Sequence, residues 1–119
     1  MESNVVEYGH PEETEFFLKG FGLSSDHDPD ECVNSFVYDY EDGNQLIITH
    51  SPSSDVSFTA TLLSQDAEIF RIHQENVTGI YFEAWGDEDV IRVHFNSDKI
   101  NSEFRVYYSP KPRIYVSNT

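Results

Sequence analysis

Alternation of apolar and polar residues, running from Asn34 almost to the end of the chain, constrains the fold more than any other feature of this sequence. Residues 56–62 (Val-Ser-Phe-Thr-Ala-Thr-Leu) alternate without an error, as expected for a strand with one buried face. Asp42-Gly43 lies between two further alternating segments, and an Asp-Gly pair in that position is the strongest local signal for a β-hairpin. The pattern therefore predicts antiparallel strands joined by short turns.

The alternating segments recur at nearly even spacing along the chain. Strands are expected at residues 36–40, 45–49, 56–62, 67–74, 77–85, 89–96, 103–109 and 113–116. The last of them follows Pro110 and Pro112, which suits the edge of a sheet because proline has no N–H to donate. The sequence thus predicts a mainly β fold, an antiparallel β-sandwich or a half-open barrel of about eight short strands.

The first third of the chain departs from this pattern. Residues 10–20 carry a proline and acids near their start and Lys19-Gly20 at their end, which predicts one short N-terminal helix. Phe17, Leu18 and Phe21 are expected to form its buried side. We therefore expect a single domain over residues 1–119, with the helix and an acidic loop at about 10–31 and a β meander at about 34–117.

Cysteine use and hydropathy indicate a cytoplasmic protein. Cys32 is the only cysteine, so no intramolecular disulfide can form. Residues 1–6 lack the basic region and apolar run of a secretory signal, and no stretch approaches the ~20 apolar residues of a membrane-spanning helix. We expect a monomer or a weak homodimer.

The strongest global signal is the net charge of −15. Residues 1–42 hold 12 acids and one base, whereas the last 21 residues hold four bases and one acid. Nucleic acids and anionic membranes need a positive protein face, so neither is expected as a direct partner. Solubility alone can account for an acidic chain, but the uneven distribution favours binding to a basic protein.

No metal site or cofactor is expected. Asp26, Asp28 and Asp30 have the spacing that opens a calcium loop, but Glu31 and Val37 stand where such a loop needs Gly and Glu. His50, His73 and His94 fall in or beside predicted strands without close ligand spacing, so solvated or hydrogen-bonded imidazoles are the expected state.

Signatures of catalysis are absent, and we predict that the chain is not an enzyme. It contains no Gly-x-Ser-x-Gly segment and no glycine loop that could hold a phosphate. The alternative is a small carbohydrate-binding or carbohydrate-active β domain, in which Glu83 would work with Asp87 or Asp89 beside Trp85.

Two segments place aromatic residues beside carboxylates, which describes a protein-binding surface, because Trp and Tyr can anchor a partner while acids steer and pair with Lys or Arg. The candidate partner-binding residues are Tyr38, Asp39, Tyr40, Glu41 and Asp42 in the first segment and Tyr81, Glu83, Trp85, Asp87, Glu88 and Asp89 in the second. Ile80, Phe82 and Ala84 alternate with the second set and are assigned to the core. The other possibility is that a second sheet covers both aromatic rows, with Trp85 in the core.

Small size, acidity and exposed aromatics together give a chain that resembles the immunity proteins of bacterial contact-dependent inhibition and other polymorphic toxin systems. The resemblance is one of general character over the whole chain and carries no residue by alignment. It implies a protein that binds and neutralises a toxin domain, often a basic nuclease. A DNA mimic, with carboxylates at phosphate-like spacing, is an alternative within the same binding class.

Overall fold

The computed structural model describes residues 9–52, 56–97 and 100–116, and its elements follow the predicted order. They are α1 (Glu13–Leu18), β1 (Gly22–Leu23), the 3₁₀ turn η1 (Pro29–Glu31), β2 (Asn34–Asp39), β3 (Asn44–Ser51), β4 (Ser57–Ser64), β5 (Ala67–Glu75), β6 (Val77–Trp85), β7 (Glu88–Ser97), β8 (Ile100–Ser109) and β9 (Arg113–Val116). Within these ranges, no helix is long and apolar enough to cross a membrane.

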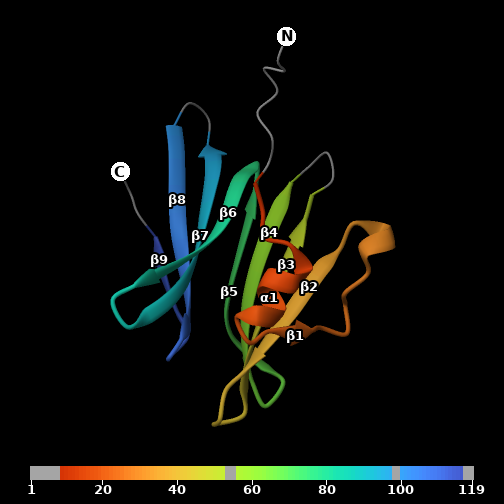
Figure 1. Cartoon of the computed structure of the whole chain (residues 1–119), viewed down its shortest axis with the longest axis vertical. Helices are drawn as coiled ribbons and strands as arrows, with labels where there is room; N and C mark the ends of the chain where they lie inside the picture. The colour runs from red at the N-terminus through yellow and green to blue at the C-terminus, as the bar shows by residue number, and fades with distance from the viewer. Residues whose placement is uncertain (1–8, 53–55, 98–99, 117–119) are drawn as a thin grey trace.

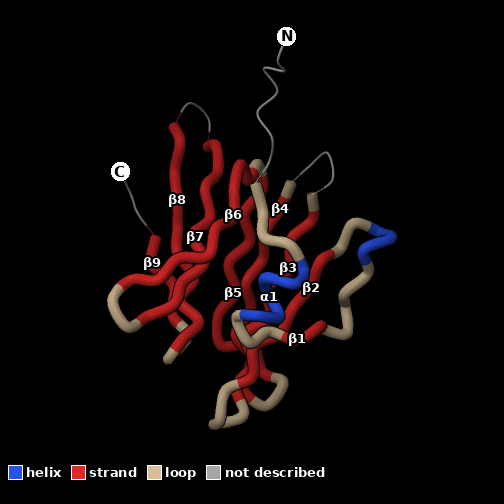
Figure 2. Tube along the Cα trace, viewed as in Figure 1, coloured by secondary structure: helices blue, strands red, loops and turns tan. Residues whose placement is uncertain are grey.

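The strands form two open antiparallel sheets, so the mainly β prediction is confirmed in its sandwich form (Figures 1 and 2). One sheet has the order β1-β2-β3-β4-β5 and the other the order β6-β7-β8-β9. Every neighbouring pair is antiparallel and consecutive in the chain, as expected for strands joined by short turns. The two-residue strand β1, which pairs with β2, was not predicted.

The chain passes from one sheet to the other at Asn76. Strand β5 ends at Glu75 and β6 begins at Val77, so a single residue separates them. Asn76 has a φ of 59°, in the left-handed region that Asn tolerates better than most residues. Its carbonyl accepts a hydrogen bond from the Asn96 backbone N–H at 3.0 Å. This sharp local turn divides what would otherwise be one long strand between two sheets.

Side chains of both sheets and of α1 meet in one hydrophobic cluster. Phe58 of β4 contacts Phe104 of β8, with ring centroids 5.7 Å apart. Phe16 of α1 stacks on Phe36 of β2 at 4.0 Å and meets Phe82 of β6 edge-on at 4.9 Å. The helix, which lies across the five-stranded sheet in Figure 1, is thereby fixed to both sheets.

The short helix is confirmed, but the prediction of its buried side is wrong for two of three residues. Phe21 is buried, whereas Phe17 is 41% and Leu18 is 85% exposed, and Phe16 is fully buried instead. Successive residues of a helix point about 100° apart, so a helix that inserts Phe16 between the sheets must turn Leu18 toward solvent. The sequence did not reveal which Phe the core would take.

Candidate functional site

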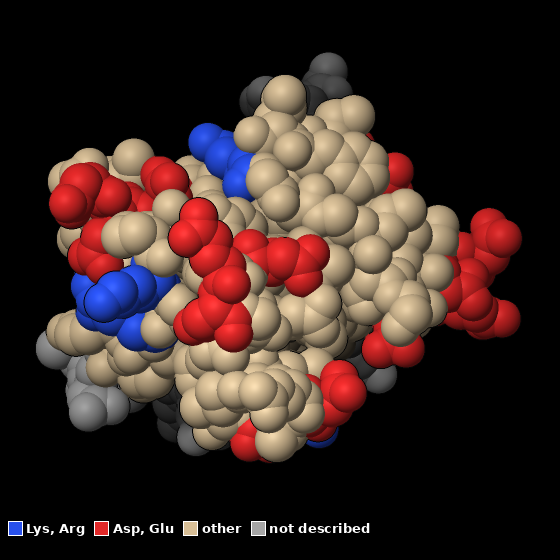
Figure 3. Space-filling view, turned by 90° about the horizontal axis from the view of Figure 1, so that it is seen from below, with Lys and Arg blue, Asp and Glu red and all other residues tan. Residues whose placement is uncertain are grey.

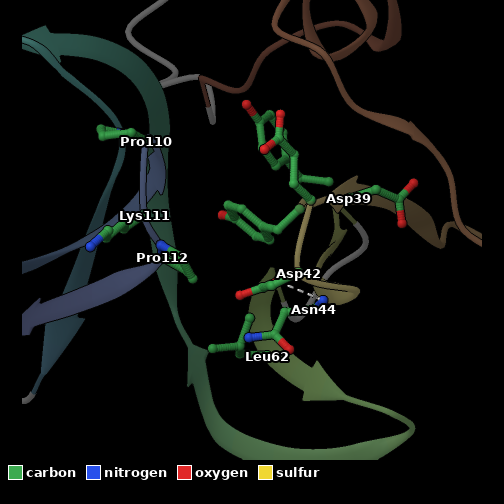
Figure 4. A pocket seen from close by; sticks show the side chains of 10 residues that line it. Asp39, Asp42, Asn44, Leu62, Pro110, Lys111 and Pro112 are labelled. Atoms are coloured by element: carbon green, nitrogen blue, oxygen red, sulfur yellow. Dashed lines mark hydrogen bonds between the residues drawn. The ribbon is translucent and has the colours of Figure 1, made fainter.

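The first predicted segment forms one wall of a groove at the β2–β3 turn. The groove has a volume of about 680 Å³ and is lined by Tyr38, Asp39, Tyr40, Glu41, Asp42, Asn44, Leu62, Pro110, Lys111 and Pro112. Figure 4 shows the residues of the turn on one side and the segment 110–112 of the other sheet opposite them. The groove therefore lies between the two sheets, where their turns approach one another.

Local sequence explains the shape of this turn. The Tyr40 N–H donates to the Asn44 carbonyl at 2.9 Å, and the Gly43 N–H donates to the Tyr40 carbonyl at 3.0 Å. Gly43 has a φ of 90°, which a residue without Cβ adopts at little cost. The Asn44 N–H donates to Asp42 Oδ1 at 2.9 Å, so one carboxylate both closes the turn and lines the groove.

Two tyrosines with partly buried rings form the floor of the groove. The Tyr38 and Tyr40 ring centroids lie 5.0 Å apart, and the Tyr40 hydroxyl donates to the Tyr108 carbonyl at 2.6 Å. Burial raises the pKa of Tyr40 well above its ordinary value, and the nearby Tyr38 and Asp42 raise it further. Tyr40 therefore stays protonated and keeps this hydrogen bond at any physiological pH.

The carboxylates at the rim of the groove have no basic partner among the residues that the structure describes. Asp39, Glu41 and Asp42 are exposed, and none of them forms an ion pair with a described Lys or Arg. Asp39 accepts a hydrogen bond from the Gln45 amide at 2.7 Å, which orients it without neutralising it. The Lys111 side chain on the opposite wall extends away from these carboxylates (Figure 4).

The second predicted segment lies on the outer face of the β6–β9 sheet, where no second sheet covers it. Tyr81 and Trp85 are 42% and 41% exposed, so Trp85 lies at the surface and not in the core. The Trp85 indole N–H donates to Glu83 Oε1 at 2.8 Å, and Glu83 Oε2 pairs with Arg92 Nη2 at 2.9 Å. Ala84, assigned to the core, is exposed, because the β6–β7 hairpin extends beyond the cluster that buries Ile80.

Arginines that the sequence analysis left out neutralise two of the predicted acids on this face. Both carboxylate oxygens of Glu88 accept hydrogen bonds from Arg113, at 2.9 and 3.1 Å, and this pairing lowers the pKa of Glu88. The Arg105 guanidinium stacks on the Trp85 ring at 3.9 Å. Glu83 and Glu88 thus form ion pairs with arginines of the same chain, unlike the acids of the groove.

The two predicted segments do not form one surface, but one acid of the second set reaches toward the first. Asp89 pairs with Ser109 in the register of β7 and β8. Burial raises the pKa of the neighbouring Tyr108, and the Asp89 charge raises it further. Tyr108 also contacts Tyr38 at 5.5 Å between ring centroids, so the residue on which Asp89 acts packs against the groove, while Asp87 is exposed in the β6–β7 turn.

Acidic character dominates the end of the molecule at which the groove lies. Seen from that end, several separate clusters of acidic side chains lie on a mostly uncharged surface, and Lys and Arg occupy fewer places than the acids (Figure 3). In the part of the chain that the structure describes, no group of three or more His, Cys, Asp or Glu side chains could hold a metal ion. His73 is exposed and hydrogen-bonded to Thr59 at 2.7 Å, as expected, and His50 is buried in the core.

Sequence reasoning missed the far wall of the groove. This wall is the segment 110–112 of the β8–β9 turn, far from residues 38–42 in the chain, while Leu62 of β4 lines the groove from the same sheet as the β2–β3 turn. The prolines were interpreted only as marks of an edge strand. No local pattern could have placed them opposite the Asp42-Gly43 turn, because that neighbourhood depends on how the two sheets pack.

Comparison with known proteins yields one structural match and no sequence match. The fold is similar to that of a chain in the contact-dependent growth inhibition toxin–immunity protein complex from Klebsiella pneumoniae 342, with a TM-score of 0.77. The match covers 92% of this chain and 95% of that chain at 15% sequence identity. No family model matches the sequence. No curated protein matches it either.

Proposed function

We propose that this chain is an immunity protein that binds a basic toxin domain and neutralises it by occupying its surface, without catalysis. The proposal is carried by the groove between the sheets, where three exposed carboxylates without a basic partner among the described residues lie beside two partly buried tyrosines. The shared fold with a chain of a toxin–immunity complex supports it at the level of architecture.

Charge gives this role a physical basis. A nuclease surface that holds phosphates is positive, and the chain carries a net charge of −15. Complementary charges raise association rates from ~10⁵–10⁶ M⁻¹s⁻¹ toward ~10⁸–10⁹ M⁻¹s⁻¹ at low salt. Rapid capture matters for a protein that must stop a toxin before the toxin acts.

The test is a binding measurement against the candidate toxin, taken as the product of the neighbouring gene and made catalytically inactive, by biolayer interferometry at two salt concentrations. Replacing Asp39, Glu41 and Asp42 with Asn, Gln and Asn should slow association about tenfold at low salt and flatten its salt dependence. The amide side chains keep the Oδ1 acceptors that Gln45 and Asn44 use, so the turn should stay folded.

The matched control removes three negative charges on the β5 side of the molecule, by Asp66→Asn, Glu68→Gln and Glu75→Gln. It has the same net charge as the groove variant and should lose much less of the association rate. Equal losses would show that overall charge, not the groove, steers the partner. No complex at micromolar concentration in low salt would contradict the immunity role.

The sugar-binding alternative predicts a different result. Trp85 would have to offer its ring to a sugar, but Arg105 covers one face of that ring and Glu83 holds its N–H. A carbohydrate ligand would be lost with Trp85→Ala and would be insensitive to salt and to the groove charges.

A further inference from the structure

We infer that the toxin interface extends from the groove over α1 and β1. In this second part, the apolar side chains of α1 and β1 contact a toxin segment that also carries Lys or Arg. The inference rests on the proposed function and adds the chemistry of the partner. The side chains concerned are first of all those that α1 exposes to solvent.

Helix α1 exposes two large apolar side chains although the core lies directly beneath it. Phe16 fills the space between the sheets, and the geometry of a helix then points Phe17 and Leu18 outward. Phe16 stacks on Phe36 and meets Phe82 edge-on, so polar residues at positions 17 and 18 would leave the main anchor of this six-residue helix in place. Leu18 therefore adds little to the described fold, and Phe17 adds an edge-on contact with the Phe36 ring.

Strand β1 adds a third apolar side chain to the same surface. Leu23 is 51% exposed, and it lies opposite Phe36 in the antiparallel register of β1 and β2, so the two side chains point to the same side of the sheet. Phe17 contacts Phe36 from above, with ring centroids 6.4 Å apart. Phe17 and Leu23 are therefore both neighbours of the buried Phe36, and Leu18 follows Phe17 in α1.

The loop after β1 is held against this apolar surface. His27 Nε2 lies 3.1 Å from Glu13 Oε2 of α1, and the His27 ring lies 5.3 Å from the Phe36 ring. The Ser35 backbone N–H donates to His27 Nδ1 at 3.0 Å. These contacts tie the loop, the helix and β2 together, so the patch is ordered before any partner arrives, which lowers the entropic cost of binding.

Exposed acids lie in and next to the segments that carry the patch, and this charge indicates a basic occupant. They are Glu12 at the N-cap of α1, Glu13 and Glu15 within α1, and Asp26, Asp28, Asp30 and Glu31 in the segment after β1. The base nearest to them in the sequence, Lys19, lies over the Phe82 ring at 5.8 Å. Apolar side chains rimmed by acids match a partner segment that carries both apolar residues and Lys or Arg.

The segment that follows α1 lies beside the groove. Phe21, which follows α1, contacts Tyr38 of the groove floor at 5.2 Å between ring centroids, and a Cβ added to Gly20 would lie 3.2 Å from the same ring. Ten residues line the groove, whereas a standard interface uses roughly 20–30 residues on each side. Adding the α1–β1 surface brings the contact area toward that size.

The experiment measures dissociation of the same inactive toxin domain from Leu18→Ser and Phe17→Ser variants. Leu18 is 85% exposed, so Leu18→Ser should fold like the wild type, whereas Phe17 is 41% exposed and Phe17→Ser also loses a contact with Phe36. Circular dichroism and thermal melts of the free proteins check the folding of both variants. Loss of a central apolar anchor should speed dissociation at least about tenfold and leave the association rate nearly unchanged. The matched control is Ile69→Ser, on β5, where an apolar side chain is 54% exposed.

The outcomes separate this inference from the proposed function. A wild-type complex whose dissociation responds to Leu18→Ser and Phe17→Ser no more than to Ile69→Ser would overturn the inference and leave the immunity role standing. A wild-type protein that does not bind the toxin domain would overturn both. The groove charges should act on association and the apolar patch on dissociation, so a combined variant should show both changes.

Discussion

His50 is the buried residue whose chemistry depends most on its surroundings. Its ring lies in the core, 6.0 Å from the Phe16 ring and 6.3 Å from the Phe36 ring, and it is 2% exposed. Burial lowers the pKa of His50 to about 4, and the positive charges that His10 and His27 acquire on protonation contribute as well. At neutral pH the imidazole is therefore neutral in the folded and in the unfolded chain.

The pKa of His50 predicts a loss of stability in mild acid. The unfolded chain takes up a proton near pH 6.5, whereas the folded chain resists protonation down to about pH 4. The contribution of His50 is thus complete above pH 6.5 and declines as the pH falls toward 4, by about 3 kcal/mol in total. Urea unfolding of the wild type and of His50→Gln between pH 7 and pH 4 measures it.

Only the difference between the two proteins is diagnostic, because protonation of carboxylates also reduces the self-repulsion of a chain at −15. The free energy of unfolding should fall more steeply for the wild type than for His50→Gln over this range. Parallel curves would show that His50 is protonated as readily in the folded state as in the unfolded one.

Among the elements, β9 is the one that depends most on charged side chains for its position. It has four residues and pairs only with β8. Arg113 at its start bonds both oxygens of Glu88 and stacks on the Tyr107 ring at 3.6 Å. Arg105 of β8 lies 5.0 Å from the Tyr115 ring, which adds a second contact between the two strands.

Replacing Arg113 with Gln should loosen β9 without unfolding the protein. Exposed ion pairs contribute little to global stability, so the unfolding midpoint should change little. Local opening should become more frequent, and hydrogen exchange followed by mass spectrometry should show faster exchange across 113–116. Arg71→Gln, which removes the same charge from an exposed arginine of β5, is the control, and equal exchange in both variants would contradict a role for the Glu88 pair.

At the scale of the whole molecule, the net charge acts over distances comparable to its dimensions. The molecule measures 51 × 36 × 25 Å. The screening length is about 30 Å at 0.01 M salt and about 10 Å at 0.1 M. At the lower concentration the repulsion between acids therefore acts across most of the structure, and at the higher one it acts mainly between neighbours.

Raising the salt concentration from 0.01 to 0.1 M should consequently stabilise the free protein. We expect the unfolding midpoint to rise by several degrees, since about 1 kcal/mol shifts it by roughly 4–8 °C in a domain slightly smaller than this one. Differential scanning calorimetry measures the shift. The same salt change should weaken toxin binding, so stability and affinity should move in opposite directions, and a falling midpoint would show that the internal ion pairs outweigh the repulsion.

The sequence by itself determined the class of fold, because its signals are local. Alternation marks strands, the Asp42-Gly43 pair marks a hairpin, and the residues around Pro11 mark a short helix. The sequence also identified residues 38–42 as acids beside aromatics, which the structure places around a groove. By the same pattern of acids beside aromatics, it also placed Glu83 and Glu88 in a second candidate surface, although both acids form ion pairs within the protein.

Only the tertiary structure decided which acids have basic partners and which apolar side chains remain in water. Glu88 meets Arg113 because β7, β8 and β9 are neighbours, and the groove acquires its far wall because Asn76 divides the strands between two sheets. Phe16 and Phe17 are the same residue type at adjacent positions, and their fates differ because only one direction from the helix leads between the sheets. These outcomes depend on residues distant in the chain, and a local pattern carries no information about the neighbours that folding will bring.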